Sequence, residues 1–385
     1  MTIGMSLVSF SWNETDPTHP ALYVGVRLIG YDTAENPLPL KDQGDGRWSG
    51  EFDLPDDLRT SYQLCPVRDT ASPDWDTAMA AGEPDPSPRV ERLVVGAYGN
   101  KQQSSILEMP GAPPQPWHQR RDDVPTGSLH HVDTGREWPE ALDIYTPRAG
   151  GQDLTTLLLL DGQAWMKLDV AATFDNLIAE GIVPPLVAAI ISYPFGPIRV
   201  RALTDPEFHL PYLLDELHPW LAKEFGASTD AADTILSGQS LGGLAAINAG
   251  LRAPERIGMV LAQSSSLWWT EGALTGEAVI ATAAENPASA TRFWFEAGVL
   301  ENEDLVAGNR RIFEVMKAQG YQGKYREYQG GHDFACWRGG LADGLISLLT
   351  SERPAPDAPP ARLAGSAEPA RAASAPRNLP GPSTA

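Results

Sequence analysis

The sequence has 385 residues, of which 42% are hydrophobic and 21% charged, so it can bury a sizeable core and is long enough for two or three domains. Its formal net charge of −21 argues against nucleic acid as a partner, because phosphate binding requires a basic surface. The two cysteines form neither a disulfide framework nor a zinc-ligand set. The chain start lacks the features of a signal peptide, and no stretch reaches the roughly 18 apolar residues of a membrane span. We therefore expect a cytoplasmic protein without a membrane partner.

The first part of the chain contains short runs of alternating apolar and polar residues. The runs at 7–12, 22–28 and 60–67 are separated by turns rich in Gly, Asp and Pro. This pattern predicts antiparallel strands and is typical of a β-sandwich. We expect this domain to span residues 1–117 and a linker to span 118–135.

From residue 136 onward the pattern changes to continuous apolar runs of strand length, separated by helical patterns. The runs lie at 155–160, 186–193, 234–238, 259–264, 292–298 and 324–331. Apolar runs that alternate with helices indicate a mostly parallel sheet covered on both faces. The predicted fold class is α/β, an α/β-hydrolase domain over 136–350. The remaining residues, 351–385, are rich in Pro, Ala and Ser, and we expect a disordered tail.

The stretch 238–242 reads Gly-Gln-Ser-Leu-Gly and lies between a predicted buried strand and a predicted helix. This is the context of a nucleophile elbow, in which a strained turn exposes the hydroxyl of Ser240. The backbone N–H of Leu241 is then placed to stabilise an oxyanion. The second oxyanion donor normally follows an early strand, which here makes the backbone N–H of Gln163 the candidate.

A serine nucleophile needs a base and an acid that orients the base. In α/β-hydrolases the acid and then the histidine follow the serine in the chain. Only His332 follows Ser240, after the last predicted strand. The strand at 292–298 is followed by Glu301, Glu303 and Asp304, and residue chemistry alone leaves all three open as the acid.

These motifs resemble the enterochelin (ferric-enterobactin) esterase family. The resemblance rests on LLLLDGQAWMK, SGQSLGGLAAINAGLRAPERIG, FEAGVLENEDL and GGHDFACWRGGLADGL, and more weakly on VSFSW and RWSGEFDL near the start. It implies a cytoplasmic serine esterase that cleaves the trilactone backbone of catecholate siderophores to release iron. It places the nucleophile on Ser240 and the base on His332, and it favours Glu301 as the acid. No metal or organic cofactor is implied, since iron arrives with the substrate.

The resemblance also indicates residues for substrate binding, because a ferric tris-catecholate is a trianion with flat aromatic arms that suit guanidinium and indole groups. The candidates are Arg199, Arg201, Trp268, Trp337 and Arg338. The chain departs from the family at Ala202, where a glutamate is usual. The alternative to substrate binding is a solvated or structural role for the arginines. For the tryptophans the alternative is packing within the protein.

The sequence alone leaves two other functions open. A β-sandwich ahead of an esterase also suits enzymes that cleave feruloyl or acetyl esters of carbohydrates. The second alternative is a siderophore-binding protein that does not catalyse hydrolysis. The presence of both Ser240 and His332 disfavours it. The oligomeric state is not indicated by any motif.

Overall fold

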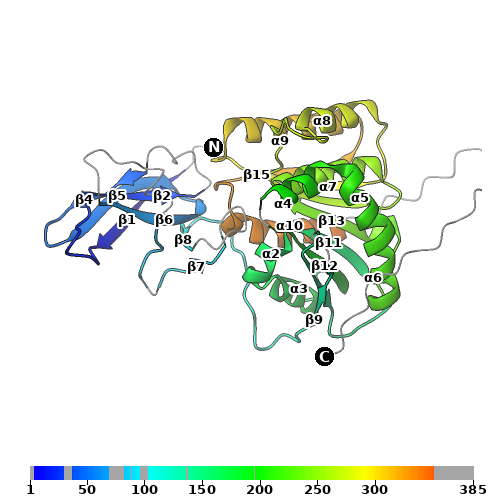
Figure 1. Cartoon of the computed structure of the whole chain (residues 1–385), viewed down its shortest axis with the longest axis horizontal. Helices are drawn as coiled ribbons and strands as arrows, with labels where there is room; N and C mark the ends of the chain where they lie inside the picture. Colours follow the sequence, from blue (N-terminus) through cyan, green and yellow to red (C-terminus); the bar gives the residue numbers. More distant parts are fainter. Residues whose placement is uncertain are drawn as a thin grey trace, which may run out of the picture.

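The computed structural model shown in Figure 1 describes residues 4–29, 37–68, 82–87, 89–95, 103–135, 138–194 and 196–350. The tail expected at 351–385 lies outside these ranges. The described chain forms an N-terminal all-β domain and a larger α/β domain, which lie beside each other along the long axis of the molecule.

Two facing sheets make up the N-terminal domain, in the orders β1-β5-β4 and β3-β2-β6-β8-β7. Their core contains Phe10 and Trp12 from one sheet and Val24, Val26 and Leu64 from the other. Alternation along each strand turns these residues inward and the polar residues outward. The predicted β-sandwich is therefore present. Its strands are β1 Met5–Asn13, β2 Tyr23–Leu28, β3 Leu38–Pro39, β4 Lys41–Asp42, β5 Arg47–Pro55, β6 Arg59–Val67, β7 Arg92–Leu93 and β8 Ser104–Glu108.

The larger domain is built on an eight-stranded sheet in the order β16-β15-β14-β13-β11-β12-β10-β9. Strand β10 is antiparallel to both of its neighbours, and the six strands β11 to β16 are parallel to one another. This order and orientation are those of an α/β-hydrolase, so the predicted fold class is confirmed. The strands are β9 Ser128–Asp133, β10 Ala141–Thr146, β11 Thr155–Leu160, β12 Leu186–Ser192, β13 Thr234–Gln239, β14 Met259–Gln263, β15 Arg292–Gly298 and β16 Gln322–Tyr328.

Strand β9 falls within residues 118–135, which we expected to form a linker. Its backbone pairs with β10 from Ser128 to Asp133 and makes it the edge strand of the large sheet. This part of the chain therefore extends the α/β domain. A polar strand of this kind escapes a search for apolar runs, because only Val132 is buried.

Helices cover both faces of the large sheet. Leu157 and Leu159 of β11 point to one face, and Leu158 and Leu160 point to the other. The first face is covered by α2 Gly162–Trp165, α3 Val170–Ala179 and α10 Phe334–Thr350. The second is covered by α4 Pro197–Thr204, α5 Pro206–Pro211, α6 His218–Phe225, α7 Leu241–Arg252, α8 Gly276–Glu285 and α9 Glu303–Ala318. Shorter helical turns occur at Met166–Leu168, Tyr212–Leu217 and Ala231–Asp233.

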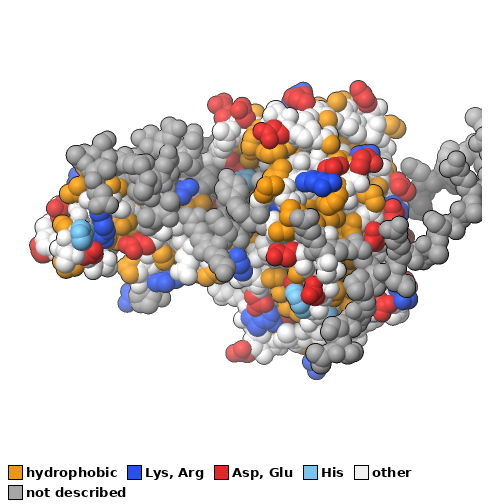
Figure 2. Space-filling model, in the orientation of Figure 1, with side chains coloured by type: hydrophobic (Ala, Val, Ile, Leu, Met, Phe, Trp, Pro, Cys, Tyr) orange, Lys and Arg blue, Asp and Glu red, His pale blue; other side chains and the backbone are white. Residues whose placement is uncertain are grey.

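Acidic and basic side chains are interspersed on both domains over the face drawn in Figure 2. The negative charge of the chain is therefore spread over this face rather than gathered in one region. Within the described ranges, none of the helices has the length and apolar character needed to cross a bilayer.

Candidate active site

Ser240 occupies a sharp turn between β13 and α7. Its backbone lies at φ 58° and ψ −123°, a region that side-chain-bearing residues rarely adopt. The neighbouring glycines make this turn possible. A Cβ on Gly238 would lie 2.4 Å from the carbonyl of Gly242, and one on Gly243 would lie 2.5 Å from the hydroxyl of Ser265. The sequence 238–242 therefore forms the elbow that its motif predicts.

His332 lies in the loop between β16 and α10, and Glu301 lies in the loop after β15. The Nδ1 atom of His332 is 2.7 Å from Oε2 of Glu301. The Glu301 side chain is fully buried, and its Oε1 atom accepts hydrogen bonds from the N–H of Gly298 at 2.7 Å and the hydroxyl of Ser264 at 2.6 Å. Three donors thus satisfy a carboxylate that burial would otherwise make costly.

The other two acidic candidates have different surroundings. Glu303 and Asp304 lie in the first turn of α9, where the Asn302 side chain accepts the N–H of Asp304 at 2.9 Å. Acidic residues at this position favour the positive end of the helix dipole. The geometry therefore brings Glu301, and neither of the other two, to His332.

Ser240 and His332 border one cavity of about 300 Å³. Its lining consists of Ser240, Ser266, Trp268, Glu301, Asn302, Asp304, Leu305 and His332. The hydroxyl of Ser240 is 3.2 Å from that of Ser266, whose own N–H donates to the carbonyl of Ser240. In this structure the nucleophile candidate is thus hydrogen-bonded to Ser266, with His332 across the same cavity.

A buried layer supports the histidine and the carboxylate from beneath. The indole N–H of Trp337 donates to Ser264 at 2.9 Å, and its ring meets the His332 imidazole edge-on at a centroid distance of 4.7 Å. Trp337 is fully buried, so it packs under the imidazole and offers no face to a substrate. Burial and the nearby charge of Glu301 hold the pKa of Tyr328 well above its usual value, so this phenol stays protonated 3.2 Å from Ser264.

One candidate for the oxyanion hole, Leu241, lies in the elbow, and the other, Gln163, follows β11, the strand next to β13. Leu241 is the first residue of α7, and Gln163 lies in α2, after β11. The Gln163 side chain is fixed by the N–H of Tyr193 at 2.9 Å and by Asp161 at 3.1 Å. Asp161 also accepts a hydrogen bond from Gln239 at 3.0 Å, which ties this loop to the elbow.

The three arginine candidates do not line this cavity, so they are not placed to contact a substrate bound in it. Arg199 is buried and forms a bidentate ion pair with Asp161, at 2.6 and 2.8 Å. Arg338 is also buried, and it binds Gln115 at 2.8 Å and Glu91 at 3.0 Å. Arg201 is exposed over the ring of Phe208, at 4.4 Å. None of the three borders the cavity, although half-exposed Trp268 does.

Sequence reasoning missed Ser264 and Ser266. Both follow β14, in the stretch QSSS, and serine alone gives no indication of a role. Ser264 has a positive φ of 47°, which turns its hydroxyl between Glu301 and Trp337. Among the described residues, no group of three or more His, Cys, Asp or Glu side chains is arranged to hold a metal ion.

Comparison with known proteins places this site in a family. Residues 137–348 match a family model described as a putative esterase, and residues 7–118 match the N-terminal domain of enterochelin esterases. An iron(III) enterobactin esterase of Dickeya dadantii (strain 3937) is 31% identical, over 91% of this chain and 89% of that protein. That of Escherichia coli (strain K12) is 34% identical over 63% of this chain and 62% of its own length.

Solved structures agree with this assignment. The crystal structure of the enterobactin esterase from Shigella flexneri in the presence of enterobactin superposes with a TM-score of 0.75 at 27% identity. It covers 89% of this chain and 93% of the Shigella chain. The ferric enterobactin esterase from Salmonella typhimurium superposes with a TM-score of 0.71.

Proposed function

Because this chain belongs to the enterochelin esterase family and is an ester hydrolase, we propose that it cleaves the trilactone backbone of catecholate siderophores by serine catalysis. The observation that carries the proposal is the shared cavity of Ser240, on its strained elbow, and His332, paired at 2.7 Å with buried Glu301. The Shigella relative solved in the presence of enterobactin supports this substrate class.

In the proposed reaction Glu301 sets the tautomer of His332. Its carboxylate accepts the Nδ1 proton, so that Nε2 carries a lone pair toward the cavity. The Ser240 hydroxyl turns from Ser266 toward Nε2, gives up its proton and attacks the ester carbonyl. The N–H groups of Leu241 and Gln163 hold the oxyanion.

The second half of the reaction regenerates the enzyme. The protonated His332 donates its proton to the leaving seryl alcohol, and a water then enters. His332 removes a proton from that water, which attacks the acyl carbonyl on Ser240. The bond between the acyl carbon and Ser240 Oγ then breaks, His332 returns the proton to Oγ, and the carboxylic acid is released. Trp268 lies at the rim, where its exposed indole is suited to stack on a catechol ring. From the family resemblance we expect this reaction to take place in the cytoplasm.

The proposal is tested by removing the nucleophile. Ser240→Ala is expected to lower kcat for an enterobactin-type trilactone by about a million-fold. Ser9→Ala, at an exposed position of β1, is a matched control that should leave kcat unchanged. Hydrolysis by Ser240→Ala at the wild-type rate would reject the proposal. A parallel assay with a feruloylated sugar tests the carbohydrate-ester alternative, which requires the faster turnover on the sugar.

A further inference from the structure

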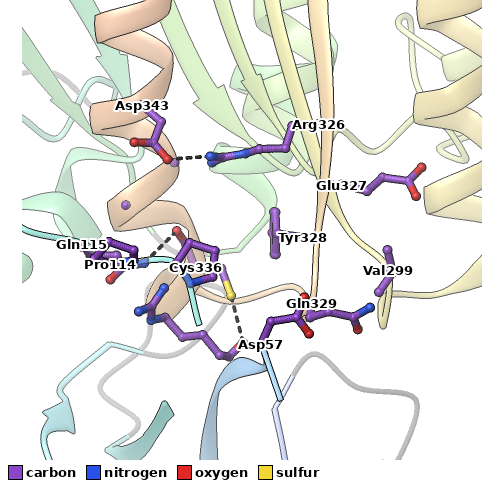
Figure 3. Close-up of a pocket in the computed structure, with 14 residues that line it drawn as sticks. Asp57, Pro114, Gln115, Val299, Arg326, Glu327, Tyr328, Gln329, Cys336 and Asp343 are labelled. Atoms are coloured by element: carbon purple, nitrogen blue, oxygen red, sulfur yellow. Dashed lines mark hydrogen bonds and ion pairs between the residues drawn. The ribbon is translucent and has the colours of Figure 1, made fainter. Parts of the chain in front are cut away.

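The loop that carries His332 is hydrogen-bonded to the N-terminal domain on both sides of the histidine. The N–H of Arg59 in β6 donates to the carbonyl of Gln329 at 2.9 Å. The thiol of Cys336 donates to the carbonyl of Arg59 at 3.1 Å. Figure 3 shows Gln329 and Cys336, both from the α/β domain, among the residues that line one pocket together with Asp57 of the N-terminal domain. One residue of the sandwich thus holds both ends of the loop.

Asp333, the residue next to His332, makes the central contact. Its Oδ2 atom accepts the backbone N–H of Ser61 in β6, and its Oδ1 atom accepts the N–H of Ala335 at 2.9 Å. The side chain is buried, and the residue directly precedes Phe334, where α10 begins, a position at which the helix dipole favours a carboxylate. A single carboxylate therefore joins β6 to the start of the helix that follows the histidine.

A second group of contacts lies one turn further along α10. Arg338 binds Glu91 and Gln115, and the Gln115 amide donates to the carbonyl of Ala335 at 2.9 Å. Glu91 and Gln115 both belong to the segment expected to form the N-terminal domain. Six polar contacts between the domains thus fall within residues 329–338, and the histidine lies among them.

Two glycines allow this close approach. A Cβ on Gly330 would lie 2.6 Å from the carbonyl oxygen of Arg59, and one on Gly339 would lie 2.5 Å from the Gln115 amide. Beside these contacts the domains leave a cavity of about 200 Å³, lined by residues that include Arg59, Gln115 and Tyr328 (Figure 3). The seam is therefore held by hydrogen bonds around a cavity, and a local substitution can loosen it.

We propose that the N-terminal domain positions the catalytic histidine, and that Asp333 is the positioning residue through which β6 fixes the His332 loop. The inference rests on the proposed serine mechanism. A misplacement of about 1 Å at a reacting group costs on the order of 100-fold in rate, so a loop fixed at both ends has a direct effect on turnover. The sandwich is then part of the catalytic apparatus as well as a neighbouring domain.

The test uses Asp333→Asn in the full chain. The amide keeps one acceptor oxygen and places an NH₂ group against either Ser61 or Ala335, which breaks one of the two bonds. We expect kcat to fall at least tenfold with KM within twofold of wild type. The downfield proton resonance of His332 Nδ1–H, bonded to Glu301, should shift or broaden, a change that a loss of stability alone does not cause.

A second variant keeps the test valid if Asp333→Asn does not fold. Glu91→Gln weakens the contact between the partly exposed Glu91 carboxylate and buried Arg338, and we expect kcat to fall about threefold with KM unchanged. Glu180→Gln breaks a comparable surface ion pair with Arg121, at 2.7 Å, and serves as the control without effect.

Two results would overturn the inference. One is wild-type kcat in the folded Asp333→Asn and Glu91→Gln variants. The other is a loss of kcat that only follows the unfolded fraction, measured by circular dichroism, with an unchanged His332 resonance. Both leave the serine mechanism standing, because that mechanism is tested separately by Ser240→Ala.

Discussion

Replacing Glu301 by glutamine is the substitution whose outcome the geometry defines most closely. The Oε1 atom of Glu301 accepts two close donors, the N–H of Gly298 and the hydroxyl of Ser264, and the Tyr328 hydroxyl lies 3.5 Å from it. The Oε2 atom faces His332 at 2.7 Å. In Glu301→Gln the amide oxygen must stay at the Oε1 position to accept both donors. The NH₂ group then donates a hydrogen bond to Nδ1 of the imidazole. Nδ1 must therefore be unprotonated, and the neutral imidazole carries its proton on Nε2.

This tautomer presents an N–H to Ser240 where the mechanism needs a lone pair. The buried negative charge that stabilises the imidazolium is lost as well. Together these effects are expected to lower kcat by about 10³- to 10⁴-fold, or about 4 to 5.5 kcal/mol in the activation free energy. The KM value should change little, because Glu301 is buried beneath the histidine.

Chromatography of the products from an enterobactin-type trilactone measures this effect. Glu303→Gln, two residues away in the first turn of α9, is the matched control and should stay within twofold of wild type. A folded Glu301→Gln variant that retains more than a tenth of wild-type kcat would refute the reasoning, since His332 would then work without its carboxylate.

Three further predictions concern charge, pH and packing. Asp304 borders the cavity, and a trianion about 8 Å from one charge is repelled by roughly 0.6 kcal/mol at physiological salt. Asp304→Asn should therefore raise kcat/KM for the ferric relative to the iron-free siderophore by two- to threefold, and an unchanged ratio contradicts this. Burial lowers the pKa of His209 from 6.5 to about 4. Between pH 4 and pH 6.5 the imidazole is therefore protonated in the unfolded chain and neutral in the folded chain. The free energy of unfolding should fall by about 3 kcal/mol from this group as the pH drops from 6.5 to 4, and His209→Leu should remove that part of the slope in urea titrations. A Cβ on Gly340 would lie 1.8 Å from Oε1 of buried Glu296. Gly340→Ala should therefore lower the free energy of unfolding by about 1 to 3 kcal/mol, measured as a lower Tm. An unchanged Tm would contradict this prediction.

The sheet and the elbow could be predicted from the sequence because their determinants are local. A parallel strand buried on both faces, such as β11, requires a continuous run of residues that can be buried, here two threonines and four leucines. The elbow at Ser240 requires small residues at fixed spacing. The position of His332 followed from chain order. The choice of Glu301 over Glu303 needed the family resemblance, because the two carboxylates differ only in where the loop after β15 directs them.

The arginines illustrate what local patterns leave undetermined. The partner of Arg199 is Asp161, 38 residues earlier, and that of Arg338 is Glu91, 247 residues earlier. A sequence reveals the charge of an arginine without revealing which carboxylate the fold brings to it. The roles of Ser264 and Ser266 were hidden for the same reason, since each depends on contacts between separate loops at one end of the sheet.

The most direct test of the central claim is to identify the residue that becomes covalently modified. The enzyme is treated with a phosphonofluoridate, which reacts with activated serines, and the labelled peptide is identified by mass spectrometry. The account predicts one phosphonyl group per chain on Ser240 and much slower labelling in His332→Ala. Labelling of another residue at the wild-type rate, or equally rapid labelling of Ser240→Ala, would contradict it.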